Sequence, residues 1–86
     1  MKNCDVVEKF YEMKDAHSSN WNLFTRYNGD RFELVNYKTV IAYIKYDIVH
    51  INISKYSSTT SAIQTLILET GAKYSSDYDF KLYKGE

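Results

Sequence analysis

The sequence predicts an α+β domain in which an antiparallel sheet of four to five strands packs on one face against two helices. Two observations lead to this prediction. Apolar residues recur at helical spacing near the amino terminus and again after residue 60, and between these segments they alternate with polar residues at strand spacing. The 86 residues are enough for a single domain, 1–86, with the element order α-β-β-β-β-α-β.

The first helix is predicted over residues 3–16. Its apolar positions lie three or four residues apart and share one face of a helix: Val6, Phe10, Met13 and His17. Asn3 or Asp5 is a suitable N-cap, and the polar run 18–20 ends the pattern.

Four strands are expected to follow as an antiparallel meander: residues 21–27, 31–37, 39–46 and 48–54. Asn28-Gly29 is a strong hairpin signal between the first two strands. A tight turn around Tyr46-Asp47 joins the last two.

The helical period returns over residues 60–71, where Ile63 and Ile67 lie on the apolar stripe. Ser61 and Gln64 have the spacing of a capping box, and Gly71 is a suitable C-cap. Residues 78–83 are predicted to form the last strand of the sheet.

The charge balance argues against simple binding to duplex nucleic acid. Eleven basic side chains balance eleven acidic ones, whereas such proteins usually carry a basic excess. A basic surplus is confined to the middle of the chain, between residues 26 and 55. Binding to nucleic acid would therefore require local segregation of charge.

Cysteine usage and hydropathy favour a cytoplasmic protein. The single cysteine, Cys4, excludes an internal disulfide and is typical of a reducing compartment. The sequence shows neither a signal-peptide pattern nor an apolar run approaching the roughly 18 residues of a membrane helix. We expect a soluble protein with no membrane partner.

Residues 37–42 follow the pattern Tyr-x-Thr-x-Ile-Ala, and residues 56–61 follow Tyr-Ser-x-Thr-Thr-Ser at the entry to a helix. With these two segments the chain resembles a family of small domains found in phages and prokaryotes. The resemblance covers residues 36 to about 66, and the chain departs from it at Ala62-Ile63, where a more polar pair is expected. It implies a fold and a phage-like setting, in which the cytoplasm is that of the host cell, but no catalytic mechanism. The abundance of residues with AT-rich codons fits such an origin.

The hydroxyl-rich run before the second helix is a candidate anion site. Free N–H groups and hydroxyls at a helix N-terminus can hold a phosphate. The residues in question are Lys55, Ser58, Thr59, Thr60 and Ser61. The alternative interpretation is that these hydroxyls only cap the helix.

Aromatic and basic side chains of the middle segment form the candidate binding surface. They are Arg26, Arg31, Tyr37, Lys38, Tyr43, Lys45, His50, Lys55 and Tyr56. Such residues on a sheet can stack unpaired bases and contact phosphates, or they can anchor a protein partner. They can also be half-buried scaffold. The aromatic motif of RNA-recognition sheets is absent from the sequence.

No catalytic residue, metal site or cofactor motif is predicted. The two histidines, His17 and His50, have no companion ligands at metal-binding spacing, and Cys4 lies in no nucleophile motif. Glu8 and Glu12 alternate with lysines on a solvated helix face. We therefore expect a protein that is not an enzyme.

These observations lead to two main hypotheses. The first is a non-enzymatic, phage-type accessory protein that docks on a host protein or ribonucleoprotein complex and inhibits host defence, as an anti-CRISPR protein does. The alternative is a module that binds single-stranded nucleic acid, such as RNA, through tyrosines and basic residues. Pairing of the last strand with a second copy would also permit a homodimer.

Overall fold

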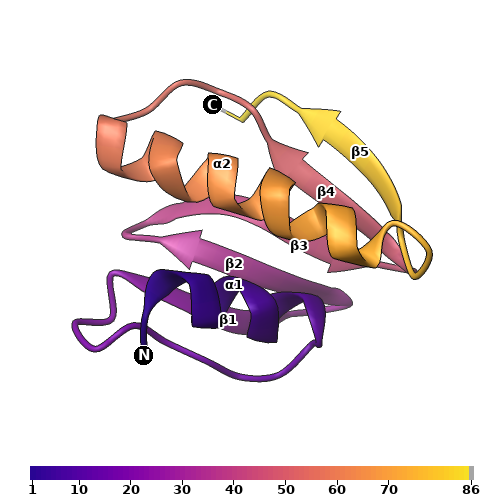
Figure 1. Cartoon of the computed structure of the whole chain (residues 1–86), viewed down its shortest axis with the longest axis horizontal. Coiled ribbons are helices and arrows are strands. Elements are labelled where there is room, and N and C mark those ends of the chain that lie inside the picture. Colours follow the sequence, from indigo (N-terminus) through magenta and orange to yellow (C-terminus); the bar gives the residue numbers. More distant parts are fainter. Residues whose placement is uncertain (86) are drawn as a thin grey trace.

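The computed structural model describes residues 1–85 and shows a two-layer α+β fold (Figure 1). The order of the elements is α1 (Asn3–Tyr11), β1 (Leu23–Asn28), β2 (Arg31–Asn36), β3 (Thr39–Lys45), β4 (Ile48–Asn52), α2 (Ser58–Gly71), the 3₁₀ turn η1 (Ala72–Tyr74) and β5 (Asp79–Tyr83). The α+β class and the order α-β-β-β-β-α-β predicted from the sequence are confirmed.

The five strands lie side by side in chain order, β1-β2-β3-β4-β5. The first four form the expected antiparallel meander. β5 pairs with β4 in parallel, so the sheet is mixed and differs here from the antiparallel prediction. The physical reason is the connection: α2 crosses back along the sheet after β4, and the chain therefore enters β5 in the same direction as β4.

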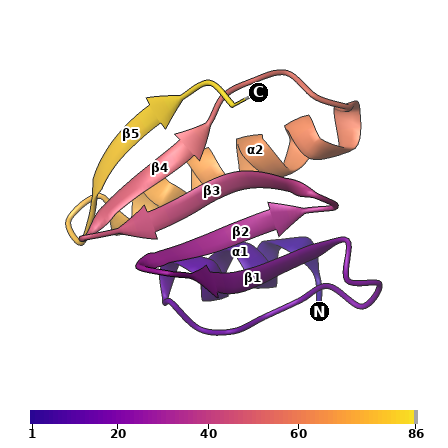
Figure 2. The ribbon, with the colours of Figure 1, turned by 180° about the vertical axis from the view of Figure 1, so that it is seen from behind.

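Both helices cover the same face of the sheet, and the other face is left uncovered (Figures 1 and 2). The helices contribute Val6, Val7, Phe10, Tyr11, Ile63 and Ile67 to the core. The sheet contributes Leu23, Phe32, Leu34, Ile41, Ala42, Ile44, Val49 and Ile51. Burial of each of the larger side chains contributes about 1.5–3 kcal/mol. None of the helices in the described residues is long and apolar enough to cross a bilayer.

The first helix is shorter than predicted and ends at Tyr11. Met13 adopts a left-handed φ of 56°, after which the chain runs beside the outer edge of β1. There the Thr25 N–H donates to the Ala16 carbonyl at 3.0 Å. This pairing satisfies the backbone groups of the segment and covers an edge strand. The prediction of a helix over residues 3–16 was therefore wrong, and His17 does not lie on a helix. The N-cap is Lys2, without a side-chain hydrogen bond, and neither predicted cap is used.

The predicted caps of the second helix were also wrong. Ser57 is the N-cap, and its Oγ accepts a hydrogen bond from the Thr60 N–H at 3.3 Å, so Ser61 and Gln64 do not form a capping box. Gly71 keeps a right-handed φ of −57°, and the helix continues into η1 beyond it. Tertiary contacts at Gly71, described below, account for glycine at this position.

Tyr11→Phe is expected to lower the free energy of unfolding by about 1 kcal/mol at neutral pH. The Tyr11 hydroxyl is buried and donates to the Ile67 carbonyl at 2.7 Å. Burial first, and then the nearby Tyr74 and Tyr78, raise the pKa of Tyr11 well above its ordinary 10.0. Above about pH 10 the unfolded chain loses the Tyr11 proton more readily than the folded chain does, which lowers the stability of the wild type. The phenylalanine variant has no such proton and does not lose this stability.

Urea unfolding at neutral pH and at about pH 11 tests this prediction, because the stability difference between the two proteins should narrow at the higher pH. A difference that is unchanged or larger at the higher pH would contradict it.

Candidate functional site

One row of side chains crosses the uncovered face of the sheet, the face turned to the viewer in Figure 2, and takes one residue from each strand. Paired residues on neighbouring strands point to the same face. The register of the four strand pairs aligns Arg26, Glu33, Tyr43, His50 and Lys81. The sheet thereby collects charged and aromatic side chains from segments as far apart in sequence as residues 26 and 81.

Glu33 is the buried centre of this row. Its side chain is only 1% exposed although it lies on the face without helices. Arg26 Nε donates to its Oε1 at 2.8 Å, Arg31 Nη2 donates to its Oε2 at 3.0 Å, and the Asn28 amide approaches Oε2 at 3.4 Å. Two guanidinium groups therefore share one carboxylate, and the cluster carries a net positive charge.

An aromatic stack adjoins the ion pairs. The Arg31 guanidinium carbon lies 3.7 Å from the centre of the Tyr43 ring. The His50 ring is parallel to the Tyr43 ring at 4.3 Å, and the Tyr83 ring lies at an angle 5.7 Å away. The faces of the Tyr43 ring are thus engaged by Arg31 and His50, and these side chains are held in place before any partner binds.

His50 is held as a neutral ring by its surroundings. Burial first, and then the positive charges of Lys81, Arg31 and Lys45, lower the pKa of His50 below 6.5. As the pH falls below 6.5, the unfolded chain takes up this proton more readily than the folded chain, so His50 makes the fold less stable in acid. At neutral pH the uncharged imidazole can stack on Tyr43 without repelling Arg31.

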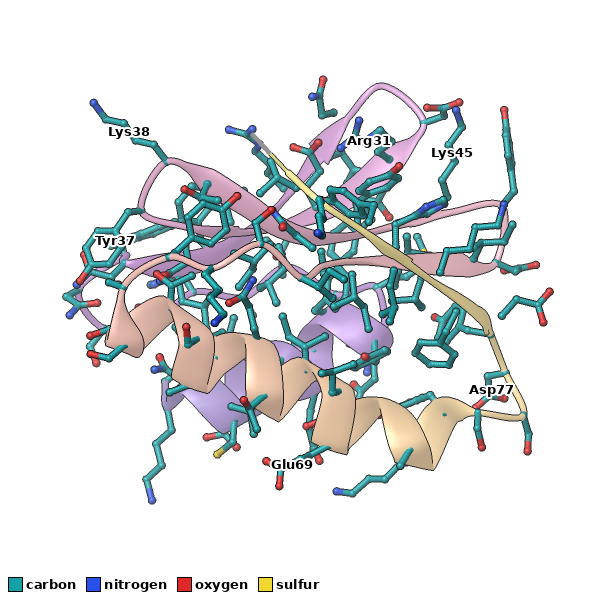
Figure 3. The ribbon with its side chains drawn as sticks, turned by 90° about the horizontal axis from the view of Figure 1, so that it is seen from above. Arg31, Tyr37, Lys38, Lys45, Glu69 and Asp77 are labelled. Atoms are coloured by element: carbon teal, nitrogen blue, oxygen red, sulfur yellow. The ribbon has the colours of Figure 1, made fainter. Side chains whose placement is uncertain are left out.

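Cations outnumber carboxylates on the uncovered face. Arg26 and Arg31 share Glu33, Lys45 pairs with Asp30 at 3.4 Å, and neither Lys38 nor Lys81 forms an ion pair with any of residues 1–85. On the helical side, by contrast, the lysines meet carboxylates: Lys9 and Lys14 both approach Glu12, at 3.7 and 3.2 Å, and Lys73 pairs with Glu8 at 2.9 Å. Figure 3 shows Arg31, Lys38 and Lys45 on the side of the sheet away from the helices, whereas Glu69 lies on the outer side of α2. The two layers therefore present different charge to a partner.

The structure brings together five of the residues predicted for the binding surface: Arg26, Arg31, Tyr43, Lys45 and His50. Tyr37 is not among them, because it lies in the β2–β3 turn with φ 57° and its hydroxyl contacts Asn22 at 3.4 Å. Lys38 occupies the same turn. Lys55 and Tyr56 lie in the connection between β4 and α2.

Sequence reasoning missed Glu33, Lys81 and Tyr83. Strand alternation places Glu33 on the same face as Arg31, and this signal was present in the sequence. Lys81 and Tyr83 reach the site only because β5 pairs in parallel with β4, and no local pattern specifies that pairing.

The hydroxyl run at the start of α2 attaches the helix to the sheet. Thr60 is 5% exposed, and its Oγ1 donates to Asn36 Oδ1 at 2.6 Å. The Gln64 amide donates to the Asn52 and Ser54 carbonyls at 2.7 and 3.0 Å. Together with the Ser57 cap, these bonds fit the capping interpretation.

The remaining candidates for the anion site have no such structural contacts to the sheet. Ser58, Thr59 and Lys55 are exposed, and Ser61 is partly exposed. Anion binding by Lys55, Ser58, Thr59, Thr60 and Ser61 stays a prediction.

Comparisons with known proteins found no relative of this chain. No family model matches the chain, and neither does any curated protein or any solved structure. Among residues 1–85, no group of three or more His, Cys, Asp or Glu side chains is arranged to hold a metal ion.

Proposed function

We propose that this domain is a non-enzymatic binding module that docks on an acidic surface of a partner protein through its uncovered sheet face. The observation that carries the proposal is the ordered cluster in which Arg26 and Arg31 surround the buried Glu33 and Arg31 stacks on Tyr43. Arginine and tyrosine are the residue types that most often dominate binding energy at protein interfaces. Because these side chains are already ordered, binding costs less conformational entropy.

Ring geometry favours a protein partner over a nucleic-acid strand. Sheets that bind single strands present the free face of an aromatic ring to a base. Here Arg31 and His50 already occupy the Tyr43 ring, with Arg31 at 3.7 Å and His50 at 4.3 Å. A carboxylate from a partner can instead approach the outer N–H groups of the arginines without disturbing the stack.

The resemblance of residues 36–66 to phage domains supports a more specific form of the proposal. In this form the chain is a phage-type accessory protein, and the partner is a host defence complex that it inhibits by direct docking, as an anti-CRISPR protein does. Binding of single-stranded RNA is the alternative, and the cation surplus of the same face favours it.

Tyr43→Ala is expected to weaken binding to the partner by roughly 30-fold, because its removal also frees the Arg31 side chain. The partner is first isolated by pull-down from a nuclease-treated lysate of a low-GC bacterium and then titrated by calorimetry. Tyr37→Ala is the matched control, since Tyr37 is 54% exposed and lies in a turn outside the cluster. Equal affinities of the two variants, with both folded, would contradict the assignment of this face.

The same titration distinguishes the two hypotheses. Binding to phosphates weakens steeply as salt rises from about 50 to about 200 mM, because counterions are released. A protein interface centred on an ordered Arg–Tyr cluster is expected to depend on salt much less. Loss of every partner after nuclease treatment would favour the RNA hypothesis.

A further inference from the structure

A polar pocket lies at one end of the uncovered face, where the β2–β3 turn, the end of β4 and the chain after β5 meet. Its volume is about 560 Å³, which lies within the range of small-molecule pockets. The side chains that give it its chemistry are Arg31, Lys38, Thr39, Asn52, Tyr56 and Tyr83. The pocket is separate from the row that crosses the centre of the sheet, although Arg31 reaches both.

Two cations of the pocket have unused hydrogen-bonding capacity. Lys38 forms no ion pair with any described residue, and Figure 3 shows it extending away from the fold. The Nε of Arg31 is shielded from solvent and has no hydrogen-bond partner. A buried donor without a partner costs about 1–3 kcal/mol, so its presence calls for an explanation. An anion that reaches this nitrogen from the pocket would satisfy it.

The pocket also offers a hydroxyl that stays protonated. Tyr83 Oη lies 3.4 Å from the Val40 carbonyl, a long hydrogen bond, and burial raises the pKa of Tyr83 to about 12. No acidic side chain within residues 1–85 lines the pocket. Glu33, the carboxylate that pairs with Arg31, already accepts hydrogen bonds from Arg26, Arg31 and Asn28.

We propose that this pocket binds the phosphate group of a small phosphorylated ligand of about nucleotide size. Arg31 and Lys38 supply two positive charges, which match the charge of a phosphate monoester, and Tyr83 supplies a neutral donor. The volume exceeds that of a phosphate group alone and leaves room for the organic part of the ligand beside the Tyr56 and Tyr83 rings. This site shares Arg31 with the proposed docking surface, but its other donors are Lys38 and Tyr83 and do not include Tyr43.

The test is a titration of the ¹⁵N-labelled protein with adenosine 5′-monophosphate at constant ionic strength, followed by NMR. Saturable shifts are expected at Lys38, Thr39, Asn52 and Tyr83. Lys38→Ala is expected to weaken binding about tenfold, and Tyr83→Phe severalfold, because each removes one donor to the phosphate. Lys45→Ala is the matched control: it removes the same charge from the same face but outside the pocket, and it should leave the affinity unchanged.

Two further ligands show whether the phosphate group of the nucleotide is what the pocket binds. Adenosine, which lacks the phosphate, should cause no saturable shifts at these residues, and inorganic phosphate should bind more weakly than the nucleotide at the same residues. Equal binding of adenosine and the nucleotide would overturn the proposal, as would equal weakening by Lys38→Ala and Lys45→Ala. Absence of shifts at millimolar nucleotide in the folded wild type would also overturn it. Tight binding of an oligothymidylate that depends equally on both lysines would replace it with binding of nucleic acid along the whole face.

Discussion

Replacing Asn52 by alanine is expected to lower the free energy of unfolding by about 3 kcal/mol. Asn52 is 2% exposed and connects three parts of the chain. Its Nδ2 donates to the Val40 carbonyl at 3.1 Å and to Tyr56 Oη at 2.9 Å. Its Oδ1 accepts from the Ser54 N–H at 2.9 Å and the Gly85 N–H at 3.2 Å. Alanine would leave backbone groups without partners where little water reaches them, and the loss would be large for a domain of this size.

Asn3→Ala is the matched control for this substitution. Asn3 is exposed at the start of α1, and its alanine variant should stay within about 0.5 kcal/mol of the wild type. Equilibrium unfolding in urea measures both variants under the same conditions. A loss below about 1 kcal/mol for Asn52→Ala would show that the network does not hold β4, the α2 connection and Gly85 together.

Gly71→Ala is expected to destabilise the domain by about 2 kcal/mol, although alanine is favoured over glycine in a helix by about 1 kcal/mol. A Cβ at this position would lie 2.7 Å from the Tyr11 hydroxyl and 3.0 Å from the Phe80 ring. The Tyr11 hydroxyl cannot simply move aside, because it donates to the Ile67 carbonyl at 2.7 Å. Glycine is therefore required here for close packing of α1, α2 and β5, although its φ is an ordinary helical one.

A double-mutant cycle tests the cause of this loss. In a Tyr11→Phe background the nearest atom is absent, so Gly71→Ala should cost less than it does in the wild type. Thr65→Ala, on the exposed side of the same helix, serves as the control and should change stability little. Stabilisation by Gly71→Ala, or exact additivity with Tyr11→Phe, would contradict the predicted clash.

The fold class was predictable because it follows from local patterns. Strand alternation and the Asn28-Gly29 hairpin specify the meander, and the stripe with Ile63 and Ile67 specifies α2. The ends of the helices were not predictable, because long-range contacts determine them. α1 stops where the chain can pair with β1, and Gly71 is a packing position whose neighbours, Tyr11 and Phe80, are distant in sequence.

The candidate site was predictable only in part, and for the same reason. Arg26, Arg31, Tyr43 and His50 belong to the meander, whose register follows from its short turns. Tyr37 was assigned to a strand, but it lies at a turn position with a left-handed φ. Lys81 depended on the parallel pairing of β5, which the crossover by α2 determines.

The segment that carries the phage resemblance has a structural role in this fold. The Asn36–Thr60 hydrogen bond of 2.6 Å joins the end of β2 to the start of α2, and Gln64 binds the end of β4. The amides and hydroxyls of the pattern are therefore needed to dock the helix on the sheet. Asn52, at the end of β4, and Tyr56, in the connection from β4 to α2, also line the polar pocket.

Lysine labelling of the partner complex tests the central claim, docking through the uncovered face, most directly. Lys45 and Lys9 are matched probes, because their side chains are 38% and 39% exposed and each pairs with one carboxylate, Lys45 on the sheet and Lys9 on α1. Acetylation in the free protein and in the complex is compared residue by residue by mass spectrometry. The proposal predicts that binding slows labelling of Lys45 and Lys81 and leaves Lys9 and Lys73 unchanged. Protection of Lys9 and Lys73 with full labelling of Lys45 and Lys81 would place the interface on the helices and contradict the proposal.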